Sequence, residues 1–335
     1  MHGTRTTAES VTVFVTGGSG FVGGAVIDHL VASGVGVNAL TRSETAAAAV
    51  RERGAVPIPG DLSDAAALRF GMEGCGIVYH VAGVNKMCSG DPGPMYRTNV
   101  DRVGDVVRAA RDTGIRRVVL TSSAAAIGEA DGIVADEETP HTGLFLSHYA
   151  RSKFLGERAF FDEAERVGIE AVAVNPTSVQ GPGRSDGSAL LLRYALSMRR
   201  PVAIETTLSV VDIDDAARAH VLAAERGVDG RRYLINGATA DIRTFMAALA
   251  DAVGRPIDPI ILPRWMATGL YPVAGIAALG RGDHPMCAEM LRTLLHGHRF
   301  DASRSIDDFG MVYTPLGDTL DRTVSWLIDE GLVSY

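Results

Sequence analysis

Residues 11–24 read VTVFVTGGSGFVGG and predict how the fold begins. The apolar run 11–16 is typical of a buried strand, and apolar residues then recur at helical spacing as far as Leu30. The turn between the two elements carries glycines spaced three apart, namely Gly17, Gly20 and Gly23. A glycine-rich turn that joins a strand to a helix lets backbone N–H groups approach a phosphate at the helix N-terminus. We therefore expect this turn to hold the pyrophosphate of a dinucleotide, the alternative being a tight turn without a ligand.

Further apolar runs predict a parallel sheet. They lie at residues 37–41, 77–81, 117–121, 171–175 and 232–236, with helical patterns between them. The run 55–59 differs because Pro57 and Pro59 cannot donate ladder hydrogen bonds, which places this strand at a sheet edge. In the doubly wound order 3-2-1-4-5-6 the third strand is the edge strand, so the sequence predicts an α/β doubly wound Rossmann fold.

The second half of the chain predicts a smaller lobe. From about Gly181 the alternation loosens, and the sequence after Ile242 is mostly helical. We expect residues 1–180 and 209–240 to form the dinucleotide-binding domain, and residues 181–208 and 241–335 to form a mostly helical substrate lobe. The lobe and a loop near it contain apolar side chains that predict a hydrophobic substrate unless they form core: Met87, Leu190, Leu191, Trp265, Met266 and Tyr271.

Composition excludes several classes of protein. The 335 residues carry a net charge of −8 without a basic block, which excludes a nucleic-acid binder. Residues 1–10 lack the apolar core of a signal peptide. The uncharged stretch 265–280 is shorter than the roughly 18 to 20 residues that cross a bilayer, so we expect no integral membrane segment. It predicts a helix packed over a substrate cavity, or a weak peripheral contact with a membrane.

Cysteines and histidines predict no bound metal. The three cysteines stand at scattered spacings that fit neither a disulfide framework nor a zinc site, which favours a reducing, cytoplasmic location. His296 and His298 are spaced like a metal-binding pair, but no cysteine or acidic residue adjoins them in the sequence as a partner. We therefore expect solvated histidines at a helix end.

The ends of the second and third strands predict which cofactor binds. Arg42 stands where an NAD-binding protein usually has an acidic residue, and an arginine there accommodates a 2′-phosphate. The sequence thus favours NADP(H), with NAD(H) possible and a solvated surface arginine as the alternative. Asp61, which precedes Leu62, is placed to accept a hydrogen bond from an adenine amino group or equally to cap a helix.

The five residues 149–153, YARSK, predict acid–base chemistry. Tyr149 and Lys153 lie one helical turn apart, and a nearby ammonium is expected to lower the tyrosine pKa from about 10 toward neutrality. Such a tyrosine can act as a general acid or base. Ser123 follows the fifth strand at the same crevice, where it can hydrogen-bond a reacting oxygen.

Several stretches together resemble the extended short-chain dehydrogenase/reductase family over nearly the whole chain. They are TGGSGFVG (16–23), GDLSD (60–64), HVAG (80–83), YRTNV (96–100), TSSAAAIG (121–128), YARSK (149–153), NPTSVQGPG (175–183) and VVDIDDAARAH (210–220). The chain looks closest to the dihydroflavonol-reductase-like branch, which includes hopanoid-associated sugar epimerases and relatives acting on 3β-hydroxysteroids. NPTSVQGPG lacks the arginine that many sugar-nucleotide enzymes have before the proline.

The resemblance implies roles for individual residues. Ser123, Tyr149 and Lys153 would be catalytic, Asn99 would support them, and Lys153 would also hold the nicotinamide ribose. The remaining cofactor-binding residues would be Gly17, Ser19, Gly20, Phe21, Val22, Arg42, Asp61, Leu62, Val81, Ala82, Gly83, Ser122, Asn175, Pro176, Thr177 and Ser178. A homodimer through the helices that start near Asn99 and His148 is implied as well.

The sequence favours reduction of a ketone or aldehyde to an alcohol on a small-molecule substrate. NADPH mainly drives reductions, whereas an epimerase returns its hydride to the same substrate. The alternatives are an NAD-dependent sugar-nucleotide epimerase, a 3β-hydroxysteroid dehydrogenase and a non-catalytic dinucleotide sensor.

Overall fold

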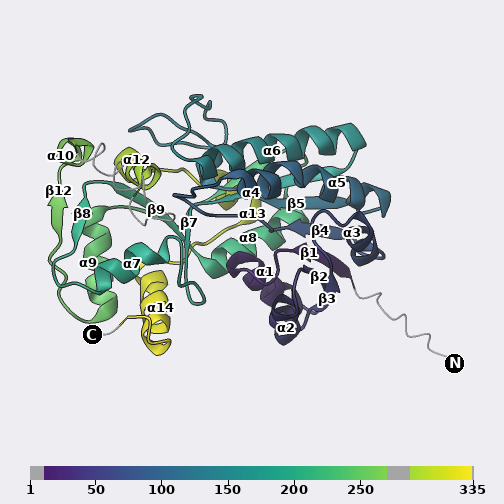
Figure 1. The fold of residues 1–335 in the computed structure, drawn as a ribbon, viewed down its shortest axis with the longest axis horizontal. Coiled ribbons are helices and arrows are strands. Elements are labelled where there is room, and N and C mark those ends of the chain that lie inside the picture. The colour runs from purple at the N-terminus through teal and green to yellow at the C-terminus, as the bar shows by residue number, and fades with distance from the viewer. Residues whose placement is uncertain (1–10, 270–286, 334–335) are drawn as a thin grey trace.

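The computed structural model describes residues 11–269 and 287–333, and its main element is a seven-stranded sheet (Figure 1). The strand order is β10-β6-β5-β4-β1-β2-β3, and every neighbouring pair is parallel. The strands are β1 (Thr12–Thr16), β2 (Gly36–Thr41), β3 (Val56–Pro59), β4 (Ile77–His80), β5 (Arg117–Thr121), β6 (Glu170–Pro176) and β10 (Arg232–Ile235). The predicted doubly wound Rossmann fold is confirmed.

The edge position of β3 follows from its prolines. β3 pairs only with β2 in this sheet, with Ala39 opposite Pro57 and Thr41 opposite Pro59. A proline has no N–H to donate to a second neighbour, so the strand is stable only where one side needs no partner.

Helices cover both faces of the sheet because alternate strand residues point to opposite sides. Val13 and Val15 of β1 pack in the cluster with α1 (Phe21–Ala32) and α8 (Ile213–Arg226). Phe14 packs on the other face with α3 (Ala65–Met72), α5 (Val103–Asp112) and α6 (His148–Val167). Figure 1 shows α6 and α8 on opposite sides of the sheet. Helices α2 (Glu44–Glu52) and α13 (Ser303–Phe309) complete this part.

The remaining elements gather at one end of the large sheet (Figure 1). They include a three-stranded sheet, β11-β9-β7, and a two-stranded sheet, β12-β8, which the sequence did not predict. The elements are β7 (Ser178–Gln180), α7 (Ala189–Leu196), β8 (Val202–Ile204), β9 (Thr207–Asp212), β11 (Ala238–Asp241), α9 (Ile242–Val253), β12 (Ile260–Leu262), α10 (Arg264–Gly269), α12 (Ala288–His296) and α14 (Leu316–Asp329). Helices α7, α9 and α14 bury one common core.

The apolar stretch 265–280 lies largely outside the described residues, so its predicted helix is described only as far as Gly269. Within 11–269 and 287–333, no helix combines the length and the apolar character needed to cross a bilayer.

The cysteine prediction is wrong for one pair. Cys88 and Cys287 form a disulfide, although 199 residues separate them in the sequence. Cys88 lies in the loop after β4 and Cys287 immediately precedes α12, and the fold brings their Cα atoms to 5.7 Å. Spacing along the chain cannot reveal a pair that only tertiary structure brings together. Cys75 is buried and free.

Candidate active site

The glycine turn packs directly against the loop after β4. Gly17 has φ +75°, and a Cβ there would lie 2.6 Å from the backbone nitrogen of Ala82. A Cβ on Gly23 would lie 2.2 Å from the carbonyl oxygen of Gly17. Gly20 is the N-cap of α1 and offers no side-chain cap. The first N–H groups of α1 therefore lack a capping side chain, as an anion-binding helix terminus requires.

The loop Val81–Gly83 continues this surface toward α6. The Ala82 N–H donates to the hydroxyl of Thr16 at 3.2 Å, so the loop is fixed to the end of β1. A Cβ on Gly83 would lie 3.1 Å from the Lys153 amine and 3.3 Å from the Asn99 side-chain oxygen. Gly83 thus leaves room for the lysine beside this loop.

Tyr149 and Ser123 meet at the start of α6. The hydroxyl of Ser147 caps this helix by accepting the Ala150 N–H at 3.0 Å, which places Tyr149 in the first turn. Ser123 follows β5 and is 8% exposed. Burial raises the pKa of Tyr149, while a hydrogen bond with Ser123 and the charge of Arg184 oppose that rise.

The prediction that Lys153 lowers the Tyr149 pKa toward neutrality is wrong for this structure. Burial dominates, and the Lys153 amine donates instead to the carbonyl oxygen of Thr121 at 3.0 Å. Helical spacing predicts that two side chains share a face, but it does not predict how much protein surrounds them.

Glu157 is a residue that sequence reasoning missed. It lies one turn after Lys153 on α6 and is 6% exposed. Burial lowers the pKa of Lys153 to about 8, and the Glu157 carboxylate opposes that fall. The carboxylate accepts from Arg232 at 3.1 Å and from the Asn175 amide at 2.6 Å. The signal was present in the spacing of Tyr149, Lys153 and Glu157, each four residues apart.

Asn99 ties the loop after β4 to α6. It lies in the π-helical turn η1 (Arg97–Asp101), which follows α4 (Gly93–Tyr96). Its side-chain oxygen accepts the Val84 N–H at 2.8 Å, and its amide donates to the Val84 carbonyl and to the Ser152 hydroxyl, each at 2.9 Å. This arrangement fits the supporting role that the resemblance implies.

The end of β6 supports the Ser123 loop. The Asn175 amide donates to the carbonyl oxygen of Ser123 at 3.1 Å. Pro176 ends β6, and the Thr177 hydroxyl donates to the Ile235 carbonyl at 3.2 Å. The Ser178 hydroxyl accepts from Gln180 at 2.9 Å. These contacts place Asn175 behind Ser123.

The residues predicted to bind the adenine ribose and the adenine lie at the ends of β2 and β3. Arg42 is exposed immediately after β2, and it has no hydrogen-bond or ion-pair partner among the described residues. One oxygen of Asp61 accepts from the N–H and hydroxyl of Ser63, at 2.7 and 2.5 Å. The cap of α3 is Asp64, so Asp61 closes the turn before that helix.

Unsatisfied buried atoms mark the same edge of the sheet. Among the described residues three of these atoms, Nε2 of His80, Oγ of Ser122 and Oδ1 of Asn175, lie at the carboxyl ends of β4, β5 and β6, and two others lie elsewhere, on His141 and Arg218. A buried polar atom without a partner costs about 1 to 3 kcal/mol. Together with the glycine cradle, they fit a polar ligand such as a dinucleotide at this edge.

Arg184 is a second missed residue. Its guanidinium lies 5.6 Å from the centre of the Phe21 ring, and its side chain is 13% exposed. Its charge also acts on Tyr149. It therefore lies near both the start of α1 and Tyr149, a position that no strand or helix pattern in the sequence predicts.

One end of the parallel sheet brings together the glycine turn, Ser123, Tyr149 and Lys153. This combination defines a dinucleotide-dependent oxidoreductase of the short-chain type. The chain belongs to the NAD dependent epimerase/dehydratase family, whose sequence profile matches residues 13–236. It is an extended short-chain dehydrogenase/reductase, an enzyme that acts on CH–OH groups with NAD(P).

Three comparisons illustrate the relationship. A Synechocystis sp. protein named provisionally as a dihydroflavonol 4-reductase is 31% identical over 96% of this chain and 95% of its own length. A ketoreductase of Stigmatella aurantiaca, named for a farnesylated dihydroquinoline oxide, is 33% identical over 72% of this chain and 73% of its own. The crystal structure of gox2253 has a TM-score of 0.84 and 28% identity, covering 97% of this chain and 100% of that one.

Proposed function

We propose that the protein is an NADP(H)-dependent reductase that converts a ketone or aldehyde to an alcohol. The observation that carries the proposal is Arg42, exposed at the end of β2 and without a partner among the described residues. Its planar guanidinium suits a phosphate, and the positive N-terminus of α2 directly follows it. Two of the relatives above are named as reductases, which supports the direction of the reaction.

We propose the following contacts for the cofactor. The glycine turn, with Ser19, Phe21 and Val22, would hold the pyrophosphate, and Asp61 with Leu62 would hold the adenine. The nicotinamide half would bind beside the remaining residues of the crevice: Val81, Ala82, Gly83, Ser122, Lys153, Asn175, Pro176, Thr177 and Ser178. When bound, NADPH supplies the hydride that reaches the carbonyl carbon of the substrate.

The protein's own groups handle the oxygen and the proton. The Ser123 hydroxyl would donate a hydrogen bond to the carbonyl oxygen and stabilise the negative charge that develops there. Tyr149 keeps its proton at neutral pH because burial raises its pKa, so it can act as the acid toward that oxygen. The Lys153 ammonium would stabilise the tyrosinate left behind, and Asn99 would position the loop that faces them.

We infer an apolar, sterol-like or polyketide-like substrate. Leu190, Trp265 and Met266 are 44, 75 and 43% exposed in the part of the chain that would form the substrate lobe. That lobe would comprise 181–208 and 241–335, and the dinucleotide-binding domain 1–180 and 209–240. We further propose a homodimer that pairs through α5 and α6. The Cys88–Cys287 disulfide removes the argument from the cysteines for a cytoplasmic location.

The test is an assay of the purified protein with NADPH or NADH and a panel of ketones, aldehydes, sterols and nucleotide sugars. Absorbance of the reduced nicotinamide is followed. We expect NADPH oxidation with at least one apolar carbonyl compound, and much slower oxidation of NADH. Interconversion of a sugar epimer with retained NAD, and no oxidation with any carbonyl compound, would overturn the proposal.

A further inference from the structure

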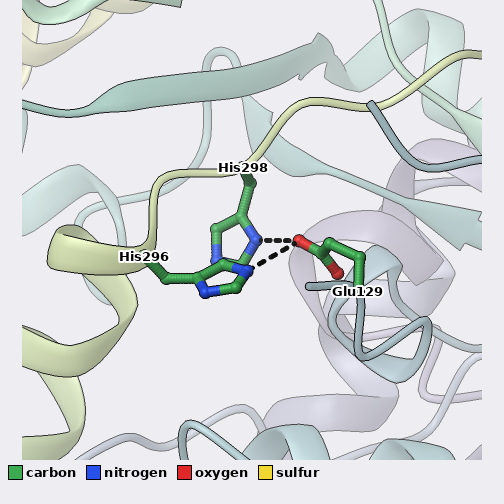
Figure 2. A group of neighbouring side chains, drawn as sticks. All are labelled: Glu129, His296 and His298. Atoms are coloured by element: carbon green, nitrogen blue, oxygen red, sulfur yellow. Dashed lines mark hydrogen bonds and ion pairs between the residues drawn. The ribbon is translucent and has the colours of Figure 1, made fainter. Parts of the chain in front are cut away.

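Glu129, His296 and His298 form a cluster away from the residues assigned to the reaction (Figure 2). Glu129 lies in the loop after the 3-10 turn η2 (Ala124–Ala126), His296 ends α12, and His298 follows two residues later. Their side chains are only 3, 11 and 23% exposed. The expectation of solvated histidines at a helix end is therefore wrong, because the acidic partner comes from a segment 167 residues earlier than His296.

We propose that this Glu–His–His cluster binds a divalent transition-metal ion, with Zn²⁺ as the expected ion. One nitrogen from each imidazole and one carboxylate oxygen all lie within 4.8 Å of one another. Two imidazoles and a carboxylate are a donor set that Zn²⁺ accepts in proteins, with a water molecule as the fourth ligand. Figure 2 shows both rings directed at the same carboxylate oxygen.

One of the two ligand-to-ligand distances already suits a tetrahedral ion, and the other is shorter. Ligand atoms about 2.0 to 2.2 Å from zinc lie about 3.3 to 3.6 Å apart in a tetrahedron. The His296 Nε2 to Glu129 Oε1 distance is 3.4 Å. The His298 Nδ1 to Glu129 Oε1 distance is 2.6 Å, a hydrogen bond that must open by about 0.7 Å to admit an ion. Rotation of one imidazole supplies that change.

The backbone holds the histidine segment in place. The His298 N–H donates to the Thr207 carbonyl at 3.1 Å, and the Ser209 hydroxyl donates to the His298 carbonyl at 2.9 Å. Ala135, six residues after Glu129, exchanges backbone hydrogen bonds with Arg299 and Asp301 at 2.9 and 2.8 Å. These hydrogen bonds hold the proposed ligands in place, and none of them uses the nitrogen or oxygen atoms that would bind the metal.

The cluster is buried and borders a cavity. The Glu129 side chain is only 3% exposed, and both histidines contact the same carboxylate oxygen. His296 also lines a cavity of about 260 Å³, together with Asp131 and Arg299.

The bound ion would join the loop that follows Ser123 to the end of α12. A metal ion that binds only the folded chain stabilises the fold. The site can therefore be tested by measuring thermal stability, without an assay of activity. A carboxylate paired with protonated imidazole would account for the same geometry without metal, and the experiment must separate the two.

The test uses the full chain without a histidine tag, stripped with a chelator and dialysed against micromolar Zn²⁺. We expect about one zinc per chain by elemental analysis, and a Tm higher by roughly 3 to 5 °C when zinc is present at about 100 times its Kd. Glu129→Gln and His298→Ala should each retain less than about a tenth of that zinc, because each leaves only two protein ligands. His29→Ala, which removes a half-exposed histidine on α1, is the matched control and should retain all of it.

Zinc content that is negligible in the wild type, or equal in the wild type and both site variants, would overturn the proposal. Circular dichroism of the metal-free variants checks that they fold. If they do not fold, Co²⁺ added to the wild type decides. Intense visible absorption typical of four-coordinate cobalt supports the site, whereas the weak absorption of hydrated cobalt refutes it.

Discussion

Replacing Glu157 by glutamine should change the pH dependence of the reaction. Glu157 lies one turn after Lys153 on α6, and its carboxylate opposes the effect of burial, which lowers the Lys153 pKa to about 8. The proposed reduction needs the ammonium form, so kcat/KM should be constant at low pH and fall as pH rises through about 8. Without the carboxylate, the ammonium loses stabilisation and the fall begins at lower pH.

The size of the change follows from Coulomb's law. Side chains at i and i+4 lie about 6 Å apart, and two unit charges at that distance interact by about 3 kcal/mol at an effective dielectric constant of about 20. Since about 1.4 kcal/mol corresponds to one pH unit, the alkaline limb should move down by about two units. Water that reaches the partly exposed Lys153 reduces this to between about one and two units.

The measurement is the pH profile of kcat/KM for NADPH oxidation with a carbonyl substrate from the panel. Glu165→Gln is the matched control, since Glu165 is exposed on the same helix, and its profile should match the wild type. Glu157→Asp keeps the charge and should restore most of the profile, which separates charge from packing. An unmoved alkaline limb in a folded Glu157→Gln variant would refute the reasoning.

Three further predictions concern turnover, cofactor choice and stability. Tyr149→Phe should lower kcat by about 10² to 10⁴ while NADPH binding, measured by fluorescence, stays unchanged; full turnover would exclude Tyr149 as the acid. Arg42→Ala should weaken NADPH binding about 10- to 100-fold and leave NADH binding unchanged, as direct titrations would show. Replacing Cys88 and Cys287 with serine should lower the free energy of unfolding by about 2 to 5 kcal/mol in denaturant titrations. Reductant should then destabilise the wild type and leave the double variant unaffected.

The fold could be predicted because its signals are local. The glycines of residues 17–23 and the prolines of β3 determine the conformation and hydrogen bonding of the backbone only within a few residues of themselves. The strands after them were placed to within one residue for the same reason, since each is a short apolar run bounded by polar turns. The small sheets β11-β9-β7 and β12-β8 were missed because strands as short as three residues show no period.

The parts of the site that escaped prediction depend on tertiary contact. Glu129 meets His296 and His298 only because the loop after η2 reaches the end of α12. The Tyr149 pKa depends on how much protein surrounds the hydroxyl, and burial there outweighs any effect of Lys153. Arg184 follows Gly181 and Gly183, and no sequence pattern specifies the path of the chain after them. Sequence spacing therefore predicted candidate reacting groups but not their electrostatic surroundings.

Helix α12 is attached at its N-terminal end to two segments that border the reacting groups. Cys287, just before it, is bonded to Cys88 in the loop after β4. Glu289 accepts the Cys88 N–H at 2.9 Å and the His148 N–H at 2.8 Å. His148 is the first residue of α6, so the carboxylate also lies at the positive end of the helix that carries Tyr149.

The other end of α12 reaches the third segment. His296 pairs with Glu129, which lies six residues after Ser123 in the loop that follows β5. One helix, with the cysteine that precedes it, thus contacts the loop after β4, the start of α6 and the loop that follows Ser123, although none of its own residues is among the predicted catalytic residues. Because interatomic placement within about 0.5 Å matters for proton transfer, a displacement of α12 would reach the reacting groups through all three contacts. The C-terminal part of the chain is therefore tied, through α12, to the segments that carry Ser123 and Tyr149.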